Sequence, residues 1–104
     1  VDKNDSVELV LHIMKWKNIH HMPVINRKRE MTGLISWHDV KTYIGNIQEQ
    51  NDSVKKIMKT NIITVSETDS INEAKSLMKT HTISCLPVIK YGKLIGLITL
   101  NDFD

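Results

Sequence analysis

The chain has 104 residues, of which 40% are hydrophobic and 25% charged, and its formal net charge is +2. This composition is typical of a folded globular module and excludes a disordered or fibrous chain. The net charge is small and the Lys and Arg residues are scattered, so we expect no nucleic-acid partner. Because no apolar run approaches the length of a membrane-spanning helix and Cys85 is the single cysteine, we expect a cytoplasmic protein without direct membrane insertion.

The first predicted element is an amphipathic helix. Apolar residues recur at helical spacing from Val7 to Met14, after a polar start that can cap the helix. Two short stretches rich in β-branched residues follow, over 22–26 and 31–36, and the polar turn between them predicts a hairpin. A second helix is predicted over 37–44.

A polar, glycine-containing stretch leads from these elements to a second set. Residues 61–65 are predicted to form a strand, and the apolar spacing from Ile71 to Met78 predicts a helix. Two further strands, over 86–90 and 93–99, predict a second hairpin. The second set therefore follows the same order as the first.

The two sets are copies of one another. At an offset of 64 residues Asp5 lies over Asp69, and the offset becomes 63 at the hairpin turn, where one residue is lost. The heptad GLISWHD at 33–39 then matches GLITLND at 96–102. A length change at a turn is what a duplicated structural unit predicts.

These copies predict an α/β (α+β) fold made of two strand-helix-strand-strand-helix units. A chain of this length is too short for two independent domains, so the copies must pack against each other. We expect the first unit over 1–48, without its leading strand, and the second over 49–104, with its last helix cut short. The chain begins at Val1 rather than Met, and we expect it to be a piece of a larger protein.

The repeated heptads have a purely structural interpretation. Ser36 and Asp39 fit an S-x-x-D capping box at the start of the helix over 37–44. Thr99 and Asp102 fit the same pattern at the start of a final helix. Neither box needs a ligand.

The chain as a whole resembles a tandem pair of CBS (cystathionine-β-synthase) domains. The resemblance covers nearly the whole chain and rests on the SINEAKSLM helix, the LPVI strand and an ending of Gly, two residues, Ser or Thr, two residues, Asp, in order and twice. It implies two units related by a pseudo-twofold axis, with two clefts that hold AMP, ADP, ATP or S-adenosylmethionine. It also implies that ligand binding regulates an attached enzyme, channel or transporter domain.

The resemblance further implies which residues line the two clefts. In the family the carboxylate of the Gly-to-Asp ending takes the ribose hydroxyls, which suits an acceptor-only group facing two donors. The first cleft would combine Gly33, Ser36 and Asp39 with Asn61, Ile63, Ile83, Ser84 and Cys85. The second would combine Gly96, Thr99 and Asp102 with Ile19, His20 and His21.

We expect a regulatory module that is not an enzyme. His20 and His21 are adjacent at a strand start, where successive side chains point to opposite faces, so we expect no metal site. No nucleophile has a positioned base, and no cofactor is required. We expect a homodimer that binds an adenosyl small molecule. The alternative is a purely structural dimerisation module, which the lack of Arg in either expected cleft favours.

Overall fold

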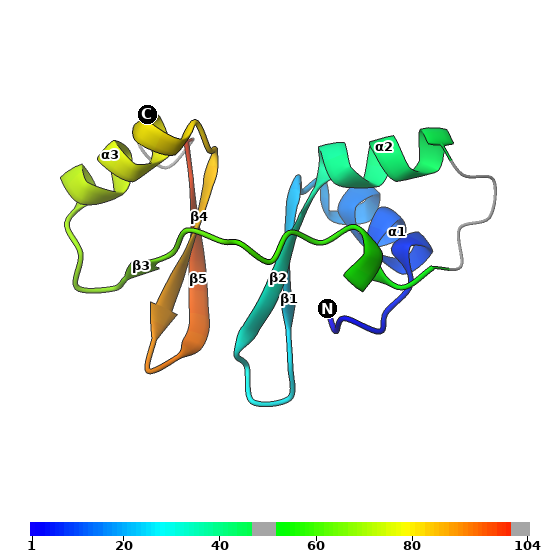
Figure 1. Cartoon of the computed structure of the whole chain (residues 1–104), viewed down its shortest axis with the longest axis horizontal. Helices are drawn as coiled ribbons and strands as arrows, with labels where there is room; N and C mark the ends of the chain where they lie inside the picture. The colour runs from blue at the N-terminus through cyan, green and yellow to red at the C-terminus, as the bar shows by residue number, and fades with distance from the viewer. Residues whose placement is uncertain (47–51, 101–104) are drawn as a thin grey trace. The chain divides into compact units, whose positions relative to one another are not determined.

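The structure is a computed structural model that describes residues 1–46 and 52–100. The chain divides into two compact units, Val1–Ile62 (unit 1) and Ile63–Asp104 (unit 2), and each combines helices with strands (Figure 1). The predicted mixed fold of two similar units is therefore confirmed. No helix in the described ranges is long and apolar enough to cross a membrane.

Unit 1 contains two helices, a hairpin and one short helical turn. They are α1 (Val7–Lys17), β1 (His21–Ile25), β2 (Met31–Ser36), α2 (Trp37–Asn46) and the 3-10 turn η1 (Val54–Lys56). The cap of α1 is Ser6, whose Oγ accepts the N–H of Leu9, and the helix ends at Asn18 in the left-handed conformation. The polar start expected for this helix is thus confirmed, with Ser6 as the capping residue.

Unit 2 repeats the helix and hairpin of unit 1 after a short leading strand. It contains β3 (Val65–Ser66), α3 (Ile71–His81), β4 (Cys85–Lys90) and β5 (Lys93–Thr99). The sheet order is β3-β4-β5, with β3 parallel and β5 antiparallel to β4. The caps of α3 match those of α1, because Ser70 Oγ accepts the N–H of Glu73 and Thr82 ends the helix in the left-handed conformation.

The strand predicted over 61–65 is wrong in extent. Its ladder with β4 contains only the pairs of Val65 with Val88 and of Ser66 with Ile89. A β-branched sequence becomes a strand only where a neighbouring backbone accepts and donates the ladder hydrogen bonds. Residues 61–64 form no ladder pairs with β4.

Part of the leading strand that the sequence seemed to lack in unit 1 is present at Val1. The N–H of Ile25 donates to the Val1 carbonyl at 2.7 Å, and the Val1 ammonium donates to the Pro23 carbonyl at 3.2 Å. The repeat offset places Val1 over Val65, which is the first residue of β3. Val1 therefore holds the position beside β1 that β3 holds beside β4.

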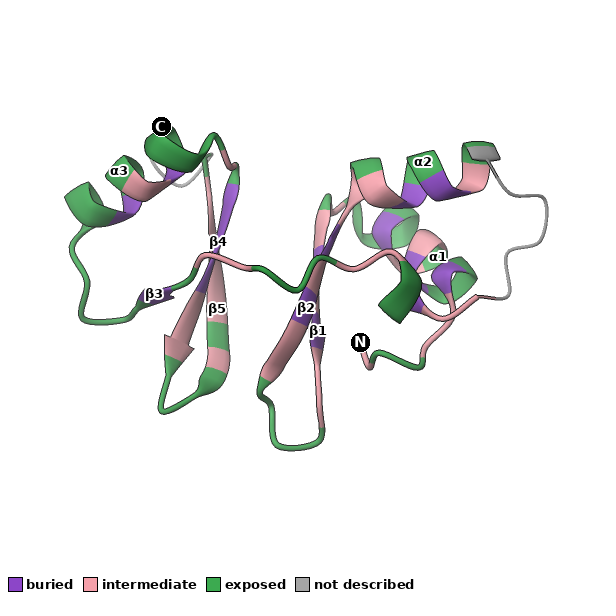
Figure 2. Ribbon diagram, viewed as in Figure 1, coloured by how far each residue is buried: buried purple, intermediate pink, exposed green. Residues whose placement is uncertain are grey.

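Each unit has its own hydrophobic core, visible as the buried residues in Figure 2. The two cores use repeat-related positions such as Met14 and Met78. The buried cluster of unit 1 consists of Val7, Val10, Met14, Met22, Val24, Ile35, Val40, Tyr43 and Val54. That of unit 2 consists of Val65, Ala74, Met78 and Leu86.

The segment that follows α2 packs against the start of α1 and belongs to unit 1. The N–H of Val7 donates to the Asp52 carbonyl at 2.9 Å, and the N–H of Val54 donates to the Asp5 carbonyl at 2.8 Å. The contact-based division after Ile62 reflects this packing, whereas the boundary after residue 48 follows the repeat and stays a prediction.

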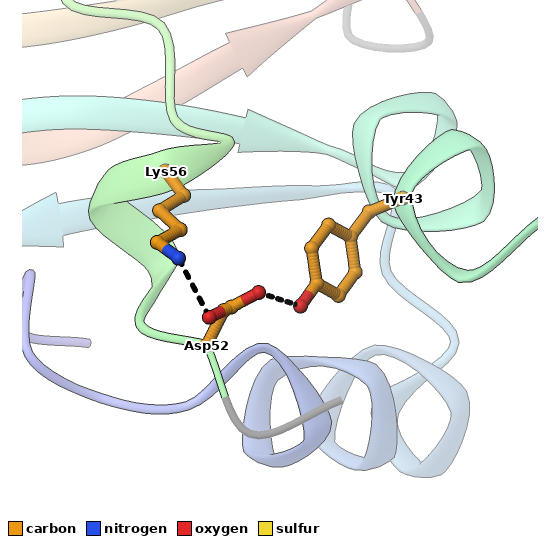
Figure 3. A network of polar contacts seen from close by, with 3 residues as sticks. All are labelled: Tyr43, Asp52 and Lys56. Carbon is orange, nitrogen blue, oxygen red and sulfur yellow. Dashed lines mark hydrogen bonds and ion pairs between the residues drawn. The ribbon is translucent and has the colours of Figure 1, made fainter. Parts of the chain in front are cut away.

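Side-chain hydrogen bonds to Asp52 also hold this segment in place (Figure 3). The Tyr43 hydroxyl donates to Asp52 Oδ2, and Lys56 Nζ donates to Asp52 Oδ1 at 2.8 Å. The hydrogen bond from Lys56, followed by that from Tyr43, lowers the pKa of Asp52 below its ordinary value of 3.8. The carboxylate therefore favours the folded state while it is ionised.

Replacing this carboxylate should lower stability in a pH-dependent way. A lowered folded-state pKa means that the stabilisation is present above pH 3.8 and disappears as the pH falls through the folded-state pKa. We expect Asp52→Asn to lower the melting temperature at neutral pH. Once the pH is below the folded-state pKa of Asp52, the melting temperature of the variant should approach that of the parent chain. Tyr43→Phe should lose part of the same stabilisation. Melting curves from pH 7 to pH 2.5 test this prediction, and a parent-variant difference that does not change with pH would contradict it.

The repeat-related glycines Gly33 and Gly96 have different surroundings. A Cβ built on Gly33 would lie 2.5 Å from Met58 Sδ and 3.1 Å from Met58 Cβ, whereas a Cβ on Gly96 would meet nothing within 4 Å. A side chain at position 33 would displace Met58, because Met58 packs directly on the backbone of β2. This contact belongs to the core of unit 1.

We expect Gly33→Ala to destabilise the chain by about 1–3 kcal/mol, because the added methyl group overpacks the Met58 contact. Gly96→Ala is the matched control, since it has room for the methyl group, and it should leave stability unchanged or raise it by up to about 1 kcal/mol. Urea denaturation of both variants measures the difference. Equal effects of the two substitutions would show that the Met58 contact is not what requires a glycine.

Candidate functional site

The candidate site in unit 1 lies where β2 ends and α2 begins. Ser36 is the last residue of β2 and lies opposite His21, the first residue of β1, in the antiparallel ladder. The N–H of Trp37 donates to the His20 carbonyl at 2.8 Å. The end of the hairpin and the first turn of α2 are therefore held together by backbone contacts.

Ser36 and Asp39 form the predicted capping box. The N–H of Ser36 donates to Asp39 Oδ2 at 3.0 Å, and the N–H of Asp39 donates to Ser36 Oγ at 3.1 Å. The structural interpretation of this half of the repeat is thereby confirmed. The Asp39 side chain is only 14% exposed, and one of its two oxygens is engaged in the cap.

A lysine that the sequence analysis did not select lies beside the other oxygen. Lys59 Nζ is 3.8 Å from Asp39 Oδ1, and the Lys59 side chain is 68% exposed. The backbone of Lys59 forms an antiparallel bridge with Leu34, with a hydrogen bond of 2.9 Å in each direction. The sequence carried no local signal for this contact, because Lys59 lies outside the stretch 61–65 from which Asn61 and Ile63 were selected.

His21 lies near the same carboxylate. Burial and the neighbouring charge of His20 lower the pKa of His21, while Asp39 acts in the opposite direction. The imidazole is therefore neutral at physiological pH. Unit 1 thus brings His21 together with Ser36 and Asp39, whereas the resemblance assigned His21 to the second cleft, and that assignment stays a prediction.

The other residues expected in the first cleft have varied surroundings. Asn61 is exposed in unit 1. In unit 2, Ile63 and Ile83 pack partly buried against the core, Cys85 is buried, and Ser84 is exposed. Cys85 is thus a small buried residue of unit 2, and each isoleucine has a core role whether or not a ligand binds.

Unit 2 repeats the hairpin end. Thr99 is the last residue of β5 and lies opposite Cys85, and the N–H of Leu100 donates to the Ser84 carbonyl at 3.3 Å. Gly96 lies opposite Val88 within the same ladder. Asp102 lies outside the described residues, so the second capping box stays a prediction. Ile19 and His20 belong to unit 1, where Ile19 packs on the core and His20 is exposed.

Unit 2 also contains a groove of about 750 Å³ beside α3. Its lining residues are Lys75, Met78, Lys79, Thr82, Ile83, Ser84 and Leu100. The repeat offset relates Met78 to Met14, and in unit 1 the side chains of Val40 and Tyr43 from α2 share the core with Met14. The groove is therefore the surface that α2 covers in unit 1, so its volume is not by itself evidence of a ligand site.

No group of three or more His, Cys, Asp or Glu side chains within the described ranges is placed to hold a metal ion. The carboxylate that acts on His21 is that of Asp39. The chemistry available in unit 1 is that of a partly buried carboxylate, a lysine ammonium and a neutral imidazole. This set suits the binding of a polar ligand that has hydroxyl groups.

Sequence similarity links this chain to known proteins. A family model described as CBS domain matches residues 1–46 and 54–103. A homoserine O-acetyltransferase of Methanococcus vannielii is 31% identical over 102 residues, which cover 96% of this chain and 21% of that protein. The chain spans about a fifth of the length of the curated relatives that it matches first.

Solved structures share the fold. CBSX2 in complex with AMP has a TM-score of 0.89, is 24% identical, and is matched over 98% of this chain and 81% of that chain. The CBS domain pair of protein MJ0100 with 5′-methylthioadenosine and S-adenosyl-L-methionine has a TM-score of 0.88, with 24% identity over 98% of this chain and 81% of that one. The cytosolic domain of the Mg²⁺ channel MgtE with ATP has a TM-score of 0.86, with 24% identity over 99% of this chain and 42% of that one.

At this identity the structural likeness shows the fold, and the family match accounts for both copies of the repeat. The resemblance noted in the sequence is confirmed. The chain belongs to the CBS domain family and carries two CBS units.

Proposed function

We propose that this chain is a regulatory module that binds an adenosine-type ligand, one of AMP, ADP, ATP or S-adenosylmethionine, and controls an attached enzyme, channel or transporter domain. Structures of the same fold contain AMP, 5′-methylthioadenosine with S-adenosyl-L-methionine, or ATP. The chain covers about a fifth of relatives named as enzymes, which supports a role beside a separate catalytic domain. We propose no catalysis by this chain and a cytoplasmic location.

The observation that carries the proposal is the geometry of Asp39. The carboxylate is 14% exposed, and Oδ2 accepts the N–H of Ser36. This hydrogen bond fixes the side chain, while Oδ1 faces the exposed Lys59 side chain. A fixed carboxylate can accept both hydroxyls of a ribose cis-diol without a large loss of side-chain entropy on binding.

The residues proposed for binding remain those of the sequence analysis. We propose Gly33, Ser36, Asp39, Asn61, Ile63, Ile83, Ser84 and Cys85 for one ligand, and Gly96, Thr99, Asp102, Ile19, His20 and His21 for a second. Gly33 takes part through the position it gives β2, because the space above its Cα is occupied by Met58.

A purely structural dimerisation module is the second candidate function. The completeness of the capping box favours it, since Ser36 and Asp39 satisfy each other without a ligand. The two candidates differ in whether any adenosyl ligand stabilises the chain. A ligand at 100 times its dissociation constant adds about 2.7 kcal/mol to the free energy of unfolding.

We expect Asp39→Asn to weaken binding of the adenosyl ligand by roughly ten- to hundredfold, which is the range for loss of a charge-assisted hydrogen bond. The Asn side chain keeps an oxygen that can accept the N–H of Ser36, so the helix cap survives. Asp39→Ala would also remove the half of the capping box in which the Asp39 side chain accepts the N–H of Ser36, at a cost of about 1 kcal/mol. Thermal-shift titrations with AMP, ADP, ATP, S-adenosylmethionine and GTP measure the effect.

The matched control is Asp69→Asn. Asp69 Oδ2 accepts the N–H of Ser66 at 2.8 Å, so the substitution changes a similar turn and removes the same charge in unit 2. Binding should survive in this variant. Equal affinity of the parent and Asp39→Asn would contradict the role of Asp39, and no shift with any adenosyl ligand would favour the structural module.

We also propose a homodimer. The exposed row on α1 consists of Leu9 and Trp16 at i and i+7, with Leu9 44% and Trp16 78% exposed, while Ile13 packs partly buried against the core. Exposed aromatic and aliphatic side chains in one row are typical of an interface. This row, on the helix that begins the described fold, is the surface proposed to meet a second copy.

We expect Trp16→Glu to shift the assembly from dimer to monomer, because a charge in a buried apolar contact is costly. Static light scattering gives the mass directly. Tyr91→Glu is the control, since Tyr91 is 91% exposed at the turn between β4 and β5. A dimer that survives Trp16→Glu, or a parent chain that is monomeric, would contradict this placement of the interface.

A further inference from the structure

Lys59 is the cationic side chain nearest to the proposed ribose-binding carboxylate among the ion pairs of unit 1. Its Nζ lies 3.8 Å from Asp39 Oδ1, and no such cation was expected from the sequence. The lack of Arg in either expected cleft favoured the structural dimerisation module. Lys59 supplies a cation at the site of Asp39 in place of an Arg.

The backbone of Lys59 is fixed by unit 1. Its N–H donates to the Leu34 carbonyl and its carbonyl accepts the Leu34 N–H, each at 2.9 Å, two residues before Ser36 in β2. The preceding side chain, Met58, packs on Gly33. Successive side chains of an extended segment point to opposite faces, so the contact of Met58 directs the Lys59 stem away from the Gly33 surface.

The contact of Lys59 with Asp39 is weak enough to be exchanged. The separation of 3.8 Å is too long for a hydrogen bond, and the lysine side chain is 68% exposed. Exposed ion pairs of this kind contribute little to stability. Ribose hydroxyls that donate to Asp39 can therefore displace the ammonium without a large penalty, and its flexible stem allows it to follow a new anionic partner.

The ammonium then faces the rest of the ligand. The cis-diol and the 5′ substituent belong to one sugar ring, so a lysine stem beside the diol-binding carboxylate reaches groups attached to the 5′ carbon. A phosphate there gains a charge-assisted contact with three possible donors. A neutral thioether gains none, and the sulfonium of S-adenosylmethionine places a second positive charge near Lys59.

We propose that Lys59 makes the site at Asp39 select adenosine ligands that carry a 5′ phosphate over those with a neutral or cationic 5′ substituent. This inference rests on the proposed function and goes beyond it by naming the ligand class and the residue that sets it. The first turn of α2, which begins at Trp37, adds a favourable dipole for an anion at the same end of the hairpin.

Isothermal titration of the 104-residue chain with AMP, adenosine and 5′-methylthioadenosine tests the inference. We expect AMP to bind the parent chain roughly ten- to hundredfold more tightly than adenosine. Lys59→Met should remove this preference by weakening AMP alone, and Lys59→Arg should keep it. The preference should also decrease with added salt.

Lys90→Met is the matched control. Lys90 Nζ lies 3.0 Å from Glu67 in unit 2, so this substitution removes the same charge and an ion pair of the same type. It should leave the AMP preference unchanged. Circular dichroism of each variant checks folding, and Lys59→Arg keeps the test valid if Lys59→Met does not fold.

The outcomes separate this inference from the proposed function. Equal affinity of the parent for AMP and adenosine, or an equal weakening of both ligands by Lys59→Met, would overturn the role of Lys59 while adenosine binding still supports the proposed function. No binding of any of the three ligands to the parent chain would overturn both.

Discussion

Two backbone hydrogen bonds between Leu34 and Lys59 set the positions of Met58 and Lys59 beside β2 and the candidate site. They bring a segment from beyond α2 against β2, although the two residues are far apart in the sequence. One side of that segment places Met58 on Gly33, and the other places Lys59 beside Asp39. A core contact and a charge at the site therefore depend on one short antiparallel bridge.

The duplication places equivalent backbone features in different surroundings. Ser36 opposite His21 and Thr99 opposite Cys85 are the same position of the hairpin, yet one partner is a half-buried imidazole and the other a buried thiol. Lys59 lies beside Asp39, the carboxylate of the first heptad. The repeat itself does not encode this contact. The two copies therefore have the same geometry but different chemistry at the hairpin end.

The sequence predicted the regular elements well because they depend on local patterns. Helical spacing and a capping serine define α1 and α3, and the repeat doubled the evidence for each hairpin. The strand over 61–65 was overestimated, since β-branched residues show propensity but not whether a ladder partner is present. Whether a ladder partner is present depends on the tertiary structure.

The site was predicted only in part for a similar reason. Ser36 and Asp39 are three residues apart, so their capping box follows from local sequence. Lys59 and His21 reach Asp39 through strand pairing, which spacing along the chain does not reveal. Gly33 was assigned to the first cleft, whereas the side chain that lies on it is Met58. Residue identity gave no indication of which atom would lie above that glycine.

The unequal cores of the two units have a consequence for how the chain opens. Within the described residues, the buried cluster of unit 1 has nine members and that of unit 2 has four. A unit with less buried apolar area opens at a lower free-energy cost, in a cooperative step of its own. Backbone amides of β4 and β5 should thus exchange with solvent sooner than those of β1 and β2. A ligand that contacts unit 2 would slow this exchange, so that occupancy is expressed as a change in local opening rather than in average structure.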